Sequence, residues 1–160
     1  MANVQLIEQF KAFYQQMLET EWAELDTIYA KDVSFCDPIH RVEGREALYR
    51  YFDDLCESVH TCRFDFLDQV VSADKAYLKW DMHFTHPKFG AQKTITVRGV
   101  SQLQFGEKGI YYHEDIYDMG ALIYENIPLF GGGVRWLKQR LAKTPPRQNA
   151  NLVGRAHRAT

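Results

Sequence analysis

The chain has 160 residues, of which 46% are hydrophobic and 25% are charged, a composition that suits one soluble globular domain. All 21 acidic residues lie within residues 1–125, which hold only 12 of the 19 basic residues and so carry a net charge of −9. This acidic body argues against a nucleic-acid-binding domain. No segment approaches the roughly 20 apolar residues that span a bilayer, and residues 1–16 do not have the pattern of a signal peptide, so we expect a cytoplasmic protein.

Apolar residues recur every three or four positions in three segments, which predict helices over residues 3–19, 22–30 and 45–59. Between the second and third helices, side chains alternate over residues 33–37 and indicate a short strand. Pro38 ends this strand, because proline cannot donate a hydrogen bond to a neighbouring strand.

From residue 63 the apolar period changes to two, which predicts strands over residues 63–72, 76–86, 92–105 and 109–118. Residues 73–75 and 106–109 are typical of hairpin turns, and short turns favour antiparallel neighbours. The predicted fold class is therefore α+β, with three N-terminal helices packed on a strongly curved antiparallel sheet. The concave side of such a sheet would enclose a cone-shaped cavity.

The chain beyond residue 125 differs from the rest in charge, because seven basic residues and no acidic residue follow Glu125. We interpret residues 1–125 as the domain and residues 126–160 as an extension, with a basic amphipathic helix over 134–143 and a flexible tail. The helix could close over the cavity as a lid, or contact an anionic membrane surface. We favour its packing on the acidic body or on a dimer partner, and rank membrane contact below that.

Three local sequences carry a resemblance to a known family: "LDTIYAKDVSFCDP", "VEGREAL" and "GIYYHEDIYD". In this order along residues 3–120, they make the chain similar to the NTF2-like superfamily, in its SnoaL-like and ketosteroid-isomerase-like branch. The resemblance implies a conical α+β barrel, a homodimer through the sheet, and one apolar pocket per subunit. Members include isomerases, polyketide cyclases, epoxide hydrolases, dehydratases and non-catalytic binders, so the fold does not determine the function.

Asp37 is the first candidate catalytic residue, since the resemblance places a general base at the Asp-Pro that ends the first strand. A carboxylate at the mouth of an apolar pocket loses solvation and becomes a better proton acceptor. The alternative is that an aspartate before proline only forms a turn.

The resemblance to ketosteroid isomerase also implies an oxyanion site, made by a tyrosine on the first helix and a protonated acid on a central strand. Either Tyr14 or Phe13 occupies the helix position. Ser101 stands where the acid is expected, and its hydroxyl is a weaker hydrogen-bond donor. This departure argues against a plain steroid isomerase.

The last predicted strand carries His113, Asp115 and Tyr117 two residues apart, so all three point to one face. The resemblance places this face on the pocket and makes Asp115 a counterpart of the last-strand acid of cyclases and epoxide hydrolases. His113 and Asp115 could form an acid–base pair, and Tyr117 could orient a carbonyl or hydroxyl group. The alternative is a buried polar network that stabilises the sheet, or a face covered by a dimer partner.

The strand over 76–86 places Trp80, Met82 and Phe84 on one face, where they would form an aromatic wall of the pocket or ordinary core. Arg98 is followed by Gly99 and Val100, so the Arg and Asp pair that epoxide hydrolases of this family use is incomplete.

We expect no metal and no cofactor. His83 and His86 would face opposite sides of their strand, which separates one of them from His113 and Asp115. The chain has no phosphate-binding glycine loop. We interpret Cys36, Cys56 and Cys62 as reduced, small apolar residues.

These observations predict a protein that binds a small apolar molecule in one pocket. If it is an enzyme, Asp37, His113 and Asp115 would perform acid–base catalysis of an isomerisation, cyclisation or dehydration, on an apolar cyclic or lipid-like substrate. Substrate contacts would come from Tyr14, Trp80, Met82, Phe84, Ser101 and Tyr117. The alternatives are a non-catalytic binding module for an apolar metabolite and a protein-interaction domain.

Overall fold

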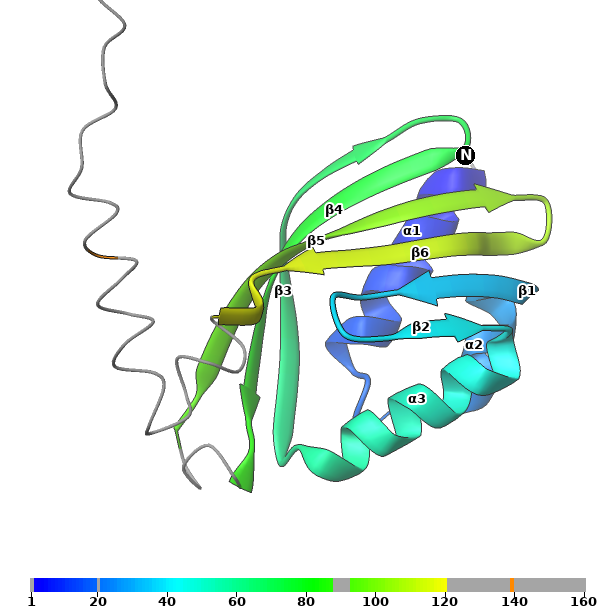
Figure 1. The fold of residues 1–160 in the computed structure, drawn as a ribbon. Helices are drawn as coiled ribbons and strands as arrows, with labels where there is room; N and C mark the ends of the chain where they lie inside the picture. Colours follow the sequence, from blue (N-terminus) through cyan, green and yellow to red (C-terminus); the bar gives the residue numbers. More distant parts are fainter. Residues whose placement is uncertain (1, 20, 88–92, 121–138, 140–160) are drawn as a thin grey trace, which may run out of the picture.

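A curved sheet of six strands organises the chain, and its helices lie across the concave side (Figure 1). The computed structural model describes residues 2–19, 21–87, 93–120 and 139. The strand order is β2-β1-β6-β5-β4-β3. The helical elements are α1 (Ala2–Gln15), the 3-10 helix η1 (Trp22–Glu24), α2 (Leu25–Ile28) and α3 (Arg45–Ser58). The strands are β1 (Tyr29–Cys36), β2 (Arg41–Glu43), β3 (Thr61–Val71), β4 (Lys75–Thr85), β5 (Ile95–Gly106) and β6 (Gly109–Tyr117).

The four C-terminal strands form the predicted antiparallel meander, in which β3 pairs with β4, β4 with β5, and β5 with β6. Along β5, buried inner residues alternate with more exposed outer residues, as the period of two predicts. The turn between β5 and β6 ends at Gly109, whose φ of 98° is a conformation that glycine adopts without strain. The α+β fold class is confirmed.

The first strand differs most from the prediction. It begins at Tyr29 rather than at residue 33, so the helix expected over 22–30 is wrong at its end, because α2 stops at Ile28. β1 also pairs in parallel with β6, with a register shift between Tyr29 and Ser34. Tyr29 and Ala30 are both buried although they are consecutive. This irregularity interrupts the period of two and conceals the start of the strand in the sequence.

A second difference is the short strand β2, which the sequence pattern does not show. It lies antiparallel to β1, with Phe35 opposite Val42. Gly44 then adopts a φ of 89° and directs the chain into α3. Three residues are too few for a period to be recognised, so pairing with β1 rather than local pattern determines this strand.

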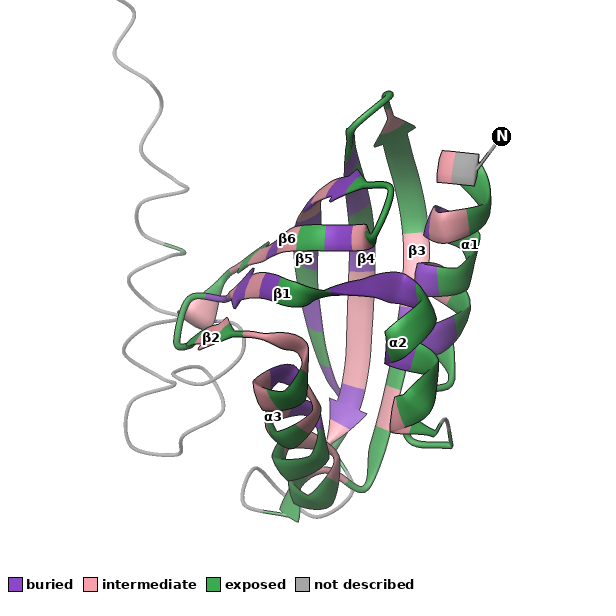
Figure 2. Ribbon diagram, turned by 90° about the vertical axis from the view of Figure 1, so that its right-hand side faces the viewer, coloured by how far each residue is buried: buried purple, intermediate pink, exposed green. Residues whose placement is uncertain are grey.

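The core lies between the helices and the concave face of the sheet, where the buried residues of Figure 2 gather. α1 packs on β3, and α3 packs on β1 and β2. α1 ends at Gln15, four residues earlier than predicted, although the apolar series continues to Met17. The buried side chains from this segment are Ile7, Phe10, Phe13, Tyr14 and Met17.

The predicted extension over residues 126–160, with its basic helix over 134–143 and its tail, lies outside the described residues apart from residue 139. Within the described parts of the chain, no helix has both the length and the apolar character to cross a membrane.

Gly99 provides a test of this packing, because a Cβ there would lie 2.3 Å from the Trp80 ring, across the β4–β5 pair. We expect Gly99→Ala to lower the free energy of unfolding by about 1–3 kcal/mol, because the ring must move. Gly106→Ala is the matched control, since nothing lies within 4 Å of its Cβ position, and should change stability by less than about 0.5 kcal/mol. Urea denaturation measures both; equal effects would contradict the packing described.

Candidate functional site

A cavity of about 370 Å³ lies on the concave side of the sheet. α1 and the residues after it, β1, α3, β3, β4 and β6 all contribute to its wall. Most lining side chains are aromatic or aliphatic, and the polar groups are few. The residues that line it are Tyr14, Met17, Phe35, Asp37, Ile39, His40, Tyr51, Phe52, Asp54, Leu55, Val59, Cys62, Phe64, Trp80, Met82, Phe84, Asp115 and Tyr117.

The structure brings most of the predicted site residues to this one cavity. Asp37, from the end of β1, and Asp115, from β6, both line it. Tyr14 rather than Phe13 faces it. Two predicted residues lie behind the wall, since Ser101 and His113 are buried and contact Asp115 instead of the cavity. The predicted wall residues Trp80, Met82 and Phe84 line the cavity together with Tyr117.

Asp37 has the position that both interpretations of the sequence require, because it forms a turn and also lines the cavity. Its Oδ1 accepts hydrogen bonds from the backbone N–H groups of Ile39 and His40, at 2.7 and 2.6 Å, which is the turn role. Its Oδ2 accepts a hydrogen bond of 2.5 Å from the Tyr51 hydroxyl. The residue also lines the cavity while only 8% exposed. Both carboxylate oxygens therefore already have protein donors.

Asp115 has a different environment. Its Oδ1 accepts a hydrogen bond of 2.5 Å from the Ser101 hydroxyl, and lies 2.8 Å from His113 Nε2. Ser101 in turn accepts a hydrogen bond of 2.9 Å from Trp80 Nε1. Within the described chain, Oδ2 of Asp115 accepts no hydrogen bond, although the residue lines the cavity. One oxygen is thus fixed by the protein and the other is left for a ligand.

His113 connects this acid to a chain of tyrosines in the core. The ring is fully buried, and its Nδ1 lies 2.8 Å from the Tyr29 hydroxyl. The Tyr29 hydroxyl lies 2.9 Å from that of Tyr14, which returns to the cavity. Because an ionised Asp115 only accepts hydrogen bonds, Nε2 donates to it. A neutral ring then accepts from Tyr29 at Nδ1, and Tyr29 accepts from Tyr14.

The tyrosines around the cavity are neutral at physiological pH. Burial is the main cause that raises the pKa values of Tyr14, Tyr29, Tyr51 and Tyr117 well above the usual value for tyrosine. For Tyr117, the nearby charges of Asp37 and Asp115 raise the pKa further. Its hydroxyl has no hydrogen-bond partner among the described residues. It is therefore available to donate to a ligand in the cavity.

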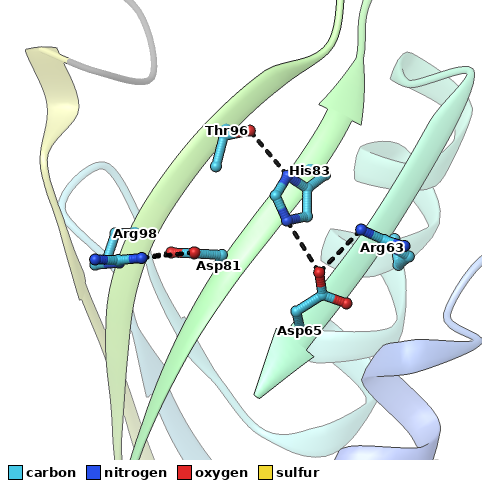
Figure 3. A network of polar contacts seen from close by, with 6 residues as sticks. All are labelled: Arg63, Asp65, Asp81, His83, Thr96 and Arg98. Atoms are coloured by element: carbon cyan, nitrogen blue, oxygen red, sulfur yellow. Dashed lines mark hydrogen bonds and ion pairs between the residues drawn. The ribbon is translucent and has the colours of Figure 1, made fainter. Parts of the chain in front are cut away.

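The outer face of the sheet holds a separate polar network (Figure 3). This network includes Arg98 and His83, which an epoxide hydrolase site and a metal site, respectively, would need in the cavity. Arg98 forms a bidentate pair with Asp81, at 2.7 and 2.8 Å, away from the cavity. It is therefore not placed to join an epoxide hydrolase site with Asp115. His83 bonds Thr96 and Asp65 on the same outer face. A metal site that joins His83 to His113 is thus impossible in this fold.

Sequence reasoning missed several residues of the site. Tyr29 was assigned to a helix, and the irregular pairing of β1 left no periodic signal for it. Tyr51 lies on α3, and its bond to Asp37 joins two elements that the sequence does not relate. Cys62 lines the cavity, where burial raises the pKa of its thiol to about 12. Such a thiol is a poor nucleophile, which agrees with the structural interpretation of Cys62.

The comparison with protein families adds a direct assignment. The family described as "SnoaL-like domain" matches residues 10–113, which is more than half of the chain and includes β1, α3 and the meander as far as His113. The chain belongs to the SnoaL-like family. A comparison with curated proteins found no match.

Solved structures agree with the family. A protein from Catenulispora acidiphila with a ketosteroid isomerase-like fold, in complex with trimethylamine, has a TM-score of 0.65 and 16% identity over 79% of this chain and 92% of that one. A candidate SnoaL-like polyketide cyclase from Shewanella denitrificans has a TM-score of 0.64 and 17% identity, over 76% and 93%. TerC, co-crystallised with polyporic acid, has a TM-score of 0.65 and 14% identity, over 76% and 95%. At these identities the SnoaL-like chain shares their fold, and activity must be argued from its own residues.

The buried polar chain can be tested at Tyr29. Tyr29→Phe removes the partner of both the Tyr14 hydroxyl and His113 Nδ1, so we expect a loss of about 1–3 kcal/mol in the free energy of unfolding. Tyr111→Phe is the control, since this tyrosine is 44% exposed and its hydroxyl makes one 3.3 Å bond. Thermal or urea denaturation compares the two, and a Tyr29→Phe variant as stable as the control would show that the chain is not formed.

Proposed function

We propose that this SnoaL-like protein is a cofactor-independent acid–base enzyme that acts on an apolar cyclic or lipid-like molecule, in an isomerisation, cyclisation or dehydration. The observation that carries this proposal is the asymmetry of Asp115, with Oδ1 fixed by Ser101 and His113 and Oδ2 left without a partner in the described chain. A carboxylate oriented in this way inside an apolar cavity is suited to accept a proton from a bound molecule. The similarity to a candidate polyketide cyclase supports this reaction class.

The proposed first step uses Asp115 Oδ2 as the base. It takes a proton from a carbon next to a carbonyl group, and the electron pair of that C–H bond moves to the carbonyl oxygen to form an enolate. The Tyr117 hydroxyl, which has no partner in the described chain, donates a hydrogen bond to this oxygen. Asp115 then returns the proton that it took to another carbon of the bound molecule or to the enolate oxygen. Asp115 thus ends in its starting protonation state.

In this proposal Asp37 assists Asp115 and is not the main base. Two backbone N–H groups already donate to its Oδ1 and Tyr51 donates to its Oδ2, so a substrate proton would compete with a protein hydrogen bond at either oxygen. We therefore assign Asp37 and Tyr51 to a second acid–base pair that assists Asp115. The contribution of Asp37 should be smaller than that of Asp115.

The alternative is a binding module that holds an apolar metabolite without chemistry. The observation that favours it is the same occupancy of Asp37, because a carboxylate used to fix a turn needs no catalytic role. The homodimer through the sheet stays a prediction. Exposed Ile116 on β6 and Tyr77 on β4 support an interface at the sheet.

A test that needs no knowledge of the natural substrate is proton exchange of a probe ketone. We expect the protein to accelerate deuterium incorporation next to the carbonyl of 2-tetralone in D₂O, followed by ¹H NMR. Asp115→Asn should reduce this rate by about 100-fold or more, because the base is lost while Asn Oδ1 can still accept from Ser101 and His113. Asp37→Asn should reduce it by about tenfold.

The control is Asp68→Asn, which removes one negative charge from an exposed position on β3. It should leave the exchange rate unchanged. Absence of exchange by the unaltered protein, or equal rates for the unaltered protein and Asp115→Asn, would remove the enzymatic proposal and leave the binding module.

A further inference from the structure

The charges that line the cavity are almost all of one sign. Asp37, Asp54 and Asp115 contribute carboxylates, whereas no lysine or arginine is among the lining residues within the described chain. His40, half exposed near Asp37, is the one lining side chain there that can become positive. A ligand with a carboxylate or phosphate group would meet uncompensated negative charge in a mostly apolar cavity.

Aromatic rings form most of the rest of the wall. The lining rings are Tyr14, Phe35, Tyr51, Phe52, Phe64, Trp80, Phe84 and Tyr117. Because burial keeps the tyrosines protonated, all of these rings are uncharged. Aromatic faces attract a cation within about 6 Å, and the attraction reaches about 2 kcal/mol when the cation loses its water.

The hydrogen-bonding groups of the wall show the same preference. Asp115 Oδ2 is an acceptor without a donor in the described chain, and it lies on the apolar cavity. Tyr14 donates its proton toward Tyr29 when His113 is neutral, so it presents lone pairs to the cavity. Among the described tyrosine and tryptophan donors that line the cavity, the Tyr117 hydroxyl is the one that we find unoccupied. The cavity therefore accepts more hydrogen bonds than it donates.

We propose that the cavity selects a protonated amine carried on an apolar body, with the positive charge among the aromatic rings and attracted by the Asp37, Asp54 and Asp115 carboxylates that line the cavity. Neutral molecules of the same shape bind more weakly, and anions are excluded. This inference rests on the proposed function, since it adds the charge of the substrate to the site where acid–base chemistry is proposed. It narrows the apolar substrate class to amines that are positively charged at neutral pH.

Three probes with the same ring and different charge test the inference: cyclohexylmethylamine, cyclohexylmethanol and cyclohexanecarboxylate. Their dissociation constants for the full chain come from NMR titration at pH 7 and low salt, where the amine is protonated. We expect the amine to bind at least tenfold more tightly than the alcohol, and the carboxylate to bind more weakly than the alcohol. Added salt should weaken binding of the amine only.

Variants locate the preference within the cavity. Asp115→Asn should reduce amine affinity about tenfold and leave alcohol affinity within twofold, and Asp54→Asn should reduce the amine preference less. Asp68→Asn removes the same charge outside the cavity and should keep the full preference. An effect of Asp68→Asn as large as that of Asp115→Asn would overturn the inference, because general attraction to an acidic protein would then explain the binding.

The outcomes separate this inference from the proposed function. If the alcohol and the amine bind equally, or the carboxylate binds best, the charge selection is wrong. Deuterium exchange of 2-tetralone would in that case still support the proposed enzyme. If the protein prefers the amine but catalyses no deuterium exchange of 2-tetralone, the inference holds for a binding module without catalysis. If no probe binds, both the selection and the apolar pocket on which the function rests fail.

Discussion

The structure depends on a chain of hydrogen-bonded polar side chains inside an aromatic core. Tyr14, Tyr29, His113, Asp115 and Ser101 come from α1, β1, β6 and β5, and each is hydrogen-bonded to the next in this order. A buried polar group without a partner costs about 1–3 kcal/mol, so each gap in this chain would remove a large part of the stability of a domain this size. The parallel pairing of β1 with β6 is what brings Tyr29 beside His113. The topology of the sheet therefore determines which polar side chains meet at the site.

This constraint also distinguishes the two acids of the cavity. Asp37 is fixed through both oxygens by a turn and by Tyr51, whereas Asp115 is fixed through one oxygen only. Both carboxyl groups are largely buried, so burial does not distinguish them. They differ in how many of their oxygens accept hydrogen bonds from the protein. The same reasoning connects catalysis and recognition, because an acid with one open oxygen can accept a proton or bind a cationic donor.

Much of the fold and of the site could be predicted from the sequence, because they follow from local patterns. The period of two gave the meander strands and placed Trp80, Met82, Phe84, Asp115 and Tyr117 on the inner face, where the structure has them. The Asp-Pro at residue 37 predicted an acid at the pocket, and Asp37 does line the cavity.

The parts of the site that the sequence does not predict depend on contacts between segments far apart in the chain. Tyr29 acquires its role through a parallel strand pair with a register shift, and Tyr51 through a bond between α3 and the end of β1. Neither contact leaves a periodic signal in its own segment. Whether Tyr14 or Phe13 reaches the cavity depends on the rotation of α1, which the packing against β3 determines. The alternatives that the sequence left open at Asp37 were also not exclusive, since one carboxylate can fix a turn and line a cavity.

The most direct measurement of the central claim is the ring N–H signal of His113 in ¹H–¹⁵N NMR optimised for imidazole. If Nε2 donates to Asp115 in a buried chain, a resolved signal that exchanges slowly with water should appear at neutral pH and shift strongly in Asp115→Asn. Rapid exchange of the His113 ring protons with water, or a signal that Asp115→Asn does not change, would contradict the buried chain and the site built on it.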